Sequence, residues 1–283
     1  MPRSGMRLAL CALTLLLSAC GTLSVQEEQQ MGAQAQAQLR KQLTFVRDPV
    51  TVNYVRKFGE SLAQAARPSP FEFRFYVVED ETLNAFAIPG GAMYVNTGLL
   101  LGVHNAAELA GVLSHEMGHV TSRHVAKMAN RSRNTGFVAN IFYLLIGILT
   151  GNPYLANAGG LAGSVAGQAY MSTYTRDAER EADGCAVETM VHAGWNPDGM
   201  VTMFQTLEKE GVGSSGPSFL SSHPATDERI ENVQRDIAKY PGSDKLRTDD
   251  GKLPIIQERL KLIIGTDREQ PADDEESEGD DED

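Results

Sequence analysis

The amino-acid sequence predicts a mainly helical α+β fold with one small β-sheet or hairpin. Two short stretches carry the β prediction: "FEFRFYVVED" at 71–80 is typical of a strand, and "NAFAIPGGAMYVNTGLL" at 84–100 of a hairpin followed by a helix start at Asn96 or Thr97. No internal repeat is visible, which argues against a repeat scaffold. Helical spacing dominates elsewhere, and helices are expected at 48–66, 105–130, 137–149, 157–172, 175–193, 197–210 and 224–239.

The first 21 residues are typical of a lipoprotein signal. Arg3 and Arg7 precede an apolar run that is too short to span a bilayer. The "LSACG" that follows resembles the lipobox of bacterial lipoproteins, which implies that residues 1–19 are removed and that Cys20 carries a lipid. Gly21 stands where an inner-membrane retention signal would place Asp, and so favours the outer membrane. The alternative is an ordinary secretory signal whose cysteine has no role.

The chain is expected to contain one main domain at 46–245 with accessory segments on either side. Residues 20–45 are predicted to be the lipidated N-terminus and a tether or helix, and residues 246–265 a C-terminal extension. Residues 266–283 hold eleven acidic residues and one Arg, a composition that predicts a disordered, solvated tail. The apolar segment 137–149 is too short for a bilayer, and a buried helix is favoured over a membrane-leaning flap.

Charge and cysteine content argue against a nucleic-acid-binding protein and against a disulfide-stabilised one. The formal net charge of −12 and the lack of a basic patch argue against nucleic acid as a partner. Of the three cysteines, Cys11 leaves with the signal and Cys20 takes the lipid, so Cys185 has no intramolecular partner and no disulfide is expected. We expect Cys185 to be a small buried core residue.

The stretch "GVLSHEMGHVTSRHV" at 111–125 indicates a metal site. His115 and His119 are four residues apart, which on a helix places both imidazoles on one face. Glu116 lies beside that pair, and H-E-x-x-H is the pattern in which two histidines bind Zn²⁺ and the Glu acts as general base. His124 cannot reach the same metal from a continuous helix and is interpreted as structural, hydrogen-bonding with Arg123 or packing nearby.

A second helix, "TRDAEREADGCAVETM" at 175–190, can supply the third ligand. Glu179 and Asp183 are four apart, so Glu179 can bind the metal while Asp183 orients a ligating histidine through its free ring nitrogen. Glu181 competes for the ligand role, but it points about 200° away from Glu179 and has no Asp partner at the same spacing. Without the histidine pair, a solvated charged face would be the better interpretation of this helix.

These motifs together resemble the gluzincin zinc metallopeptidases, the family of BepA, LoiP, HtpX and the CAAX prenyl protease. The resemblance covers roughly residues 30–240 and is greatest to the periplasmic lipoprotein members. It implies a zincin-like domain that holds one Zn²⁺ per chain through His115, His119 and Glu179, with Asp183 supporting the site. In "SSHPATDERI" at 221–230, His223 and Arg229 match a further family element.

For that element, two roles remain open. His223 and Arg229 can donate to the oxyanion of the tetrahedral intermediate, or His223 can be a fourth zinc ligand that blocks water as a self-inhibiting switch. The remaining alternative is a structural Ser-His-Pro helix cap. The "EGVGSSGPSF" that precedes this element has the flexible composition that either catalytic role needs.

The expected activity is zinc-dependent endopeptidase action in the periplasm on misfolded or unassembled envelope proteins, with Glu116 as general base. An edge strand made of Ala92, Met93, Tyr94 and Val95 is expected to line the cleft and pair with extended substrate. One alternative is a lipid-anchored chaperone or binding module that keeps zinc for structure. Another is a latent peptidase with a flap at 137–171. The oligomeric state stays open.

Overall fold

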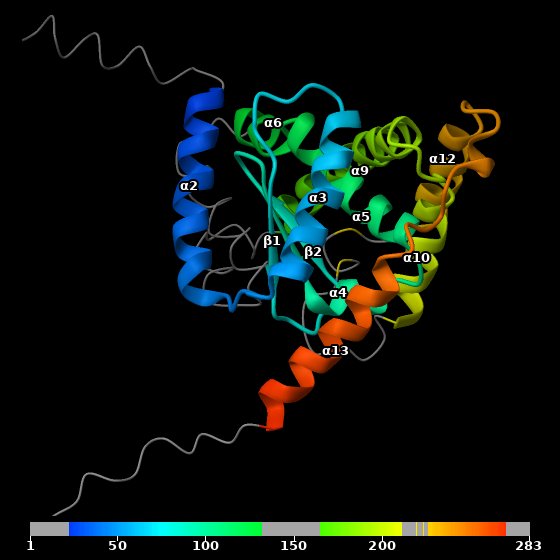
Figure 1. Ribbon diagram of the computed structural model, residues 1–283. Coiled ribbons are helices and arrows are strands. Elements are labelled where there is room, and N and C mark those ends of the chain that lie inside the picture. The colour runs from blue at the N-terminus through cyan, green and yellow to red at the C-terminus, as the bar shows by residue number, and fades with distance from the viewer. Residues whose placement is uncertain (1–22, 132–164, 211–218, 220–222, 224–225, 270–283) are drawn as a thin grey trace, which may run out of the picture.

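The computed structural model describes residues 23–131, 165–210, 219, 223 and 226–269 (Figure 1). The predicted signal with Cys20, the apolar segment 137–149 and the chain beyond residue 269 lie outside the described residues. The predicted fold class is confirmed, because helices dominate and the described strands form one three-stranded sheet. Within the described part of the chain, no helix combines the length and the apolar character needed to cross a membrane.

The sheet is built around β3 (Ala92–Asn96). β1 (Arg74–Val78) pairs with it in parallel and β2 (Ala85–Ile88) pairs with it in antiparallel, so the strand order is β1-β3-β2. Gly90 and Gly91 form the turn from β2 to β3 with φ of 85° and 88°. Residues with a Cβ are strained in that conformation, which explains the Gly-Gly pair in the sequence.

The expectation that residues 92–95 form the edge strand is wrong. Both sides of β3 are paired with neighbouring strands, so its backbone has no free edge. Among the described strands, β2 lies at the edge instead, and it packs beside α5 (Ala106–Thr121). Because Asn84 O accepts a hydrogen bond from Asn96 N, alternation along the strand turns the backbone groups of Ala85 and Ala87 away from β3.

The sheet separates two apolar clusters of different size. Alternate residues of a strand point to opposite faces, and one face packs against α2 (Val25–Gln42), seen beside the sheet in Figure 1. That smaller cluster includes Leu39, Phe86 and Tyr94. The opposite face joins the main core, which four helices complete: α3 (Pro49–Ala65), α5, α9 (Val165–His192) and α10 (Gly199–Glu210). The predicted tether therefore contains a helix that packs on the sheet.

α3 (Pro49–Ala65) and α13 (Leu253–Glu269) close the main core beside α4 (Thr97–Gly102). Asp48 caps α3 by accepting a hydrogen bond from Thr51 N, and it also accepts one from Arg259 Nε of α13 at 2.8 Å. The main core includes three residues of α13, Leu253, Ile256 and Leu260. Most of the segment predicted as a C-terminal extension is therefore packed as part of the domain.

α5 and α9 (Val165–His192) approach closely where the site is built. A Cβ on Gly118 would lie 2.9 Å from the Cα and the carbonyl oxygen of Ala182, so only glycine fits this contact. The predicted helix 105–130 is interrupted, since α5 ends at Thr121 and α6 (His124–Arg131) starts a separate helix. The other described elements are α10 (Gly199–Glu210), α12 (Asp227–Ile237) and a short 3₁₀ turn (Ser243–Lys245).

Candidate metal centre

α5 and α9 bring the three predicted ligands together. His115 Nε2 lies 3.0 Å from His119 Nε2 and 3.3 Å from Glu179 Oε2. His119 Nε2 lies 3.3 Å from Glu179 Oε1. In a tetrahedral zinc site with ligand bonds of about 2.0–2.1 Å, ligand atoms are about 3.3 Å apart. The spacing of these donors therefore fits a single zinc ion.

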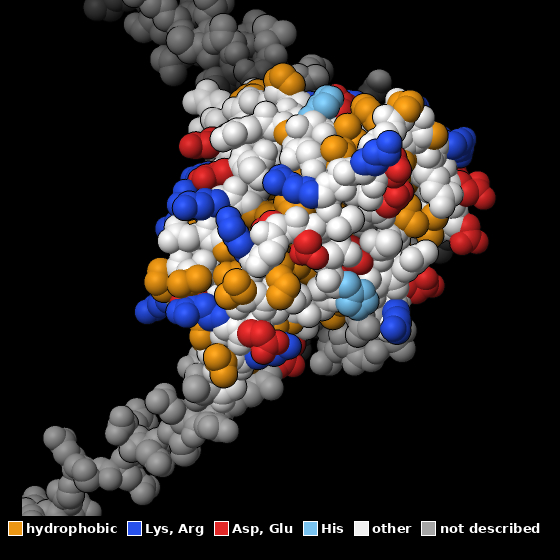
Figure 2. Space-filling view, turned by 45° about the vertical axis from the view of Figure 1, so that its right-hand side comes forward, with side chains coloured by type: hydrophobic (Ala, Val, Ile, Leu, Met, Phe, Trp, Pro, Cys, Tyr) orange, Lys and Arg blue, Asp and Glu red, His pale blue; other side chains and the backbone are white. Residues whose placement is uncertain are grey.

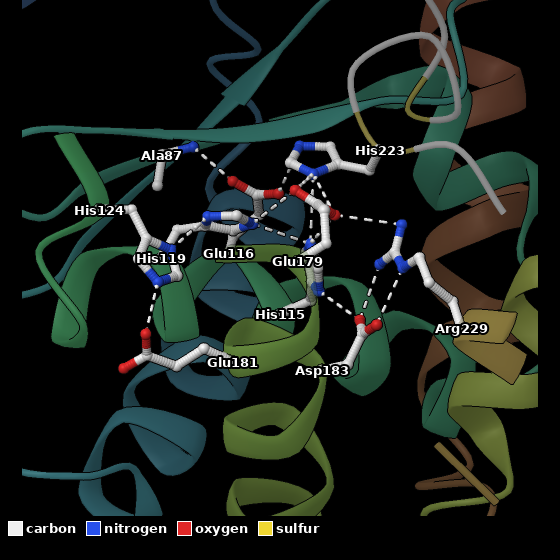
Figure 3. A network of polar contacts seen from close by, with 10 residues as sticks. All are labelled: Ala87, His115, Glu116, His119, His124, Glu179, Glu181, Asp183, His223 and Arg229. Atoms are coloured by element: carbon white, nitrogen blue, oxygen red, sulfur yellow. Dashed lines mark hydrogen bonds and ion pairs between the residues drawn. The ribbon is translucent and has the colours of Figure 1, made fainter. Parts of the chain in front are cut away.

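His223 completes the group from a separate part of the chain (Figure 3). Its Nδ1 lies 2.9 Å from Glu179 Oε1 and 3.2 Å from His115 Nε2. The ring is stacked on Phe219, with ring centroids 4.7 Å apart. One ligand atom from each of His115, His119, Glu179 and His223 lies within 4.8 Å of the others. Three imidazoles and a carboxylate are a donor set that zinc accepts readily.

A buried carboxylate supports the first histidine. Asp183 Oδ1 lies 2.8 Å from His115 Nδ1, and both side chains are almost fully buried. This contact directs Nε2 of His115 toward the other donors. Burial alone lowers the pKa of His115, but the carboxylates of Glu179 and Asp183 outweigh it and raise the pKa to about 9. The same surroundings hold the pKa of Glu179 below its usual range: burial raises it, and His223 and His115 more than compensate.

Arg229 is placed differently from the expected oxyanion donor. Its Nε and one terminal nitrogen donate to the two oxygens of Asp183 at 2.9 and 2.7 Å, and the other terminal nitrogen lies 3.1 Å from Glu179 Oε2. The guanidinium also lies over the ring of Phe204. It is buried, and its three nitrogens face carboxylates rather than the space beside Glu116 (Figure 3). This geometry favours a positioning role for Arg229.

Glu116 projects from α5 beside the two histidines. Its Oε2 accepts a hydrogen bond from Ala87 N on the edge strand β2 at 3.0 Å. Its Oε1 has no hydrogen-bond partner among the described residues, and His223 Nε2 lies 3.4 Å away. Burial raises the pKa of this carboxyl group above its ordinary value. A buried carboxylate held by one oxygen, with the other facing the donors, is suited to accept a proton.

His124 lies behind His119, on the side away from the donors. His124 Nδ1 is 2.8 Å from His119 Nδ1, and its Nε2 is 3.2 Å from Glu181 Oε2. Burial and the neighbouring His119 lower the pKa of His124 to about 4. The assumption of a continuous helix is wrong, because the chain turns at Arg123, whose φ is 51°. His124 therefore contacts the predicted ligand His119 through Nδ1 and Glu181 through Nε2.

The turn at Arg123 is held by contacts with α2 and with Leu23, which precedes that helix. A left-handed backbone costs a non-glycine residue on the order of 1–2 kcal/mol. Arg123 Nε donates to the buried Glu28 at 2.8 Å, and its terminal nitrogen donates to Leu23 O at 2.8 Å. These charge-assisted hydrogen bonds offset the strain. Nothing in the local sequence, such as Gly or Pro, signals this turn, so sequence analysis missed both it and the His119–His124 contact.

Two imidazoles and a carboxylate from two helices, with a second glutamate beside them, define the site of a zincin metallopeptidase. The sequence comparison agrees with this class. Residues 49–237 match peptidase family M48, and the chain belongs to this family. Its members are zinc-dependent metalloproteases, so zinc is the metal that the donor group in this chain fits.

Several relatives share most of the chain. The beta-barrel assembly-enhancing protease of Yersinia pestis is 31% identical over 219 residues, which cover 77% of this chain and 45% of that protein. A putative beta-barrel assembly-enhancing protease of Vibrio cholerae is 33% identical over 226 residues, 78% of this chain and 46% of that protein. The metalloprotease YcaL of Escherichia coli is 30% identical over 197 residues, 64% of this chain and 71% of that protein. The chain thus spans less than half the length of the first two.

Proposed function

We propose that this protein is a zinc endopeptidase of the bacterial envelope that hydrolyses unfolded or misassembled proteins. The observation that carries the proposal is the convergence of His115, His119 and Glu179 with Glu116 beside them. The donors are spaced for one metal ion, and Glu116 is buried with one oxygen facing them. Family membership supports the same chemistry.

The residues of the site divide the reaction between them. Bound zinc supplies a Lewis acid that polarises the scissile carbonyl and makes a water molecule more acidic. Glu116 takes the proton from that water and delivers it to the leaving amine. The hydrogen bond from Ala87 N holds Oε2 of Glu116, which leaves Oε1 for the proton. Asp183 keeps the ring of His115 in one orientation, and Arg229 keeps both Asp183 and Glu179 in place.

The edge strand β2 is the proposed binding site for extended substrate. The backbone groups of Ala85 and Ala87 point away from β3, and Ala87 N already reaches Glu116. Because Ala87 N is already engaged by Glu116, a substrate strand that pairs with the remaining groups, Ala85 N and O and Ala87 O, would pass next to Glu116. Backbone pairing with two alanines places few demands on substrate side chains, which suits a protease of unfolded chains.

His223 is proposed to occupy the fourth metal position at rest and to leave it during turnover. The distances from His223 Nδ1 to Glu179 and His115 match those between the other donors. A fourth protein ligand would take the position that the reacting water needs. A peptidase regulated in this way stays silent until His223 moves, which limits damage to folded envelope proteins.

The location rests on the N-terminal sequence. Processing before Cys20 would produce a lipid-bearing N-terminus that attaches the chain to a membrane. Gly21 favours the outer membrane, with the protein in the periplasm. The names of the relatives in Yersinia pestis and Vibrio cholerae refer to assembly of β-barrel proteins, which supports envelope proteins as the substrate class.

A second candidate function is a lipid-anchored chaperone or binding module with a structural zinc. The position of His223 favours it, because four protein ligands would close the site. Such a site does not require Glu116, whose buried carboxylate has one oxygen without a hydrogen-bond partner among the described residues. The two functions therefore differ in what Glu116 does.

The Glu116→Gln substitution separates them. Gln keeps the size of the side chain and can still accept the hydrogen bond from Ala87 N, but it cannot take a proton. We expect kcat for unfolded casein to fall by about 10²–10⁴-fold while zinc content and thermal stability stay unchanged. Glu60→Gln, on the surface of α3, is the matched control and should leave all three values unchanged. Equal kcat values for casein cleavage by the wild type and by Glu116→Gln would overturn the peptidase assignment.

A further inference from the structure

A chain of polar contacts runs from His119 to the surface on the side away from the metal donors (Figure 3). His119 Nδ1 meets His124 Nδ1 at 2.8 Å, and His124 Nε2 meets Glu181 Oε2 at 3.2 Å. Both oxygens of Glu181 accept hydrogen bonds from Lys127 Nζ, at 2.9 and 2.7 Å. None of the three residues beyond His119 belongs to the donor group.

Metal binding by His119 fixes the protons along this chain. When Nε2 of His119 binds a metal, its Nδ1 must carry the proton and donate it in a hydrogen bond. His124 Nδ1 is then the acceptor, so the proton of His124 is on Nε2 and points to Glu181. With the metal on Nε2 of His119, this arrangement gives every ring nitrogen of the two histidines a partner. It resembles the support of His115 by Asp183, with a neutral imidazole inserted between the ligand and the carboxylate.

The backbone turn at Arg123 makes the contact possible. On a continuous helix, His124 would follow His119 by five residues, about 140° round the axis, and its ring could not reach Nδ1 of His119. The left-handed residue Arg123 redirects the chain so that His124 folds back. Glu28 and Leu23 of the N-terminal region hold that turn through the Arg123 side chain. Strained backbone that other contacts stabilise is typical of functional sites.

We propose that His124 and Glu181 are positioning residues for the metal ligand His119. His124 accepts the Nδ1–H of His119, which fixes the ring plane and leaves Nε2 deprotonated toward the metal, and Glu181 fixes the tautomer of His124. The proposal rests on the metal site of the proposed function. It assigns to Glu181 a supporting role, whereas Glu179 is the ligand. It also gives a function to His124, which lies outside the H-E-x-x-H motif.

The alternative is that His124 only fills space and Glu181 only forms a surface ion pair with Lys127. Zinc affinity of the purified full chain, measured by competition with a fluorescent chelator, separates the two. Partners that orient metal ligands change affinity by about 10–100-fold. His124→Phe keeps the ring and removes both nitrogens, whereas His124→Asn keeps an acceptor close to the place of Nδ1. Unfolding of the metal-free variants in denaturant measures their stability separately.

We expect His124→Phe to weaken zinc binding by at least about tenfold, and His124→Asn to restore it to within about threefold of wild type. Glu181→Gln should weaken binding by a smaller factor, about threefold to tenfold. The matched control is Glu188→Gln, which removes a comparable ion pair with Arg67 from the same helix but touches no ligand. It should bind zinc as wild type does.

Three results would overturn the proposal. The first is a zinc affinity of His124→Phe equal to that of the wild type. The second is an equal loss of zinc affinity in His124→Phe and His124→Asn, in proportion to their loss of stability in the metal-free state. If His124→Phe does not fold, the Glu181→Gln variant decides the question alone. The third result is then a zinc affinity of Glu181→Gln equal to that of Glu188→Gln. A wild-type protein without zinc affinity would instead overturn the proposed function, so the two failures are distinguishable.

Discussion

The two histidines of the H-E-x-x-H motif have different surroundings. His115 is fully buried, and its Nδ1 meets Asp183 directly, with Arg229 behind that carboxylate. The side chain of His119 is 18% exposed, and its Nδ1 meets a second imidazole whose carboxylate partner, Glu181, is 42% exposed. One half of the site is thus held by buried charges and the other reaches solvent. The two histidine ligands of one metal site are therefore supported by different means, one by buried charges and the other by contacts that reach the surface.

Breaking the buried half should have the largest effect. Asp183→Ala leaves His115 without its partner and the buried Arg229 with Glu179 as its remaining carboxylate. We expect the free energy of unfolding to fall by roughly 3–5 kcal/mol, since a buried charge loses its partner. Zinc should be lost as well. Chemical denaturation and metal analysis measure both, and Asp177→Ala at an exposed position of α9 is the control. A decrease in the free energy of unfolding below about 1 kcal/mol would show that the buried Asp183 does not stabilise the site.

The pH dependence of activity reports on Glu116, which lies between the two halves. The pKa of this group is raised by burial, so its carboxylate takes up a proton at a higher pH than an exposed Glu does. The base is lost as the pH falls, and kcat/KM should drop about tenfold for each pH unit below the pKa. The midpoint should lie above 4.5, the ordinary Glu value. An acid limb at or below that value would contradict the role of burial.

Substitution of His223 tests whether this residue controls access to the metal. If it is a resting ligand, His223→Ala should weaken zinc binding and raise the initial rate of casein cleavage by a few-fold, because the fourth position is open. Zinc affinity and initial rates at saturating zinc measure these effects. A drop in kcat of about 10²-fold with unchanged zinc affinity would instead identify His223 as the oxyanion donor.

The smallest effect is expected at the solvent edge. Lys127 and Glu181 are both more than 40% exposed, so solvent screens their ion pair strongly. Lys127→Ala should lower the free energy of unfolding by no more than about 1 kcal/mol, and added salt should reduce the difference. A loss comparable to that of Asp183→Ala would remove the contrast between the two halves.

The sequence predicted the parts of the site that depend on spacing within one helix. His115 and His119 share a face because they are four apart, and Glu179 could be chosen over Glu181 because only Glu179 has an Asp one turn away. The structure brings these residues together. The fold class followed from the same periodicities.

What the sequence could not predict depends on contacts between distant segments. The order of three strands is not encoded in the pattern of any one of them, so β3 was expected at the edge that β2 occupies. The turn at Arg123 depends on Glu28, which lies far away in the chain. The role of Arg229 depends on where α12 meets α9, and the packing of α13 on α3 and α4 has a similar origin.

X-ray absorption of the purified full-length protein at the zinc edge shows which side chains bind the metal ion. We expect one zinc per chain, surrounded only by nitrogen and oxygen ligands at about 2.0–2.1 Å, with imidazole scattering from His115, His119 and the resting ligand His223. Glu179→Gln should lose most of that zinc. A protein without stoichiometric metal, or a zinc with a sulfur ligand at about 2.3 Å, would rule out the proposed metal site.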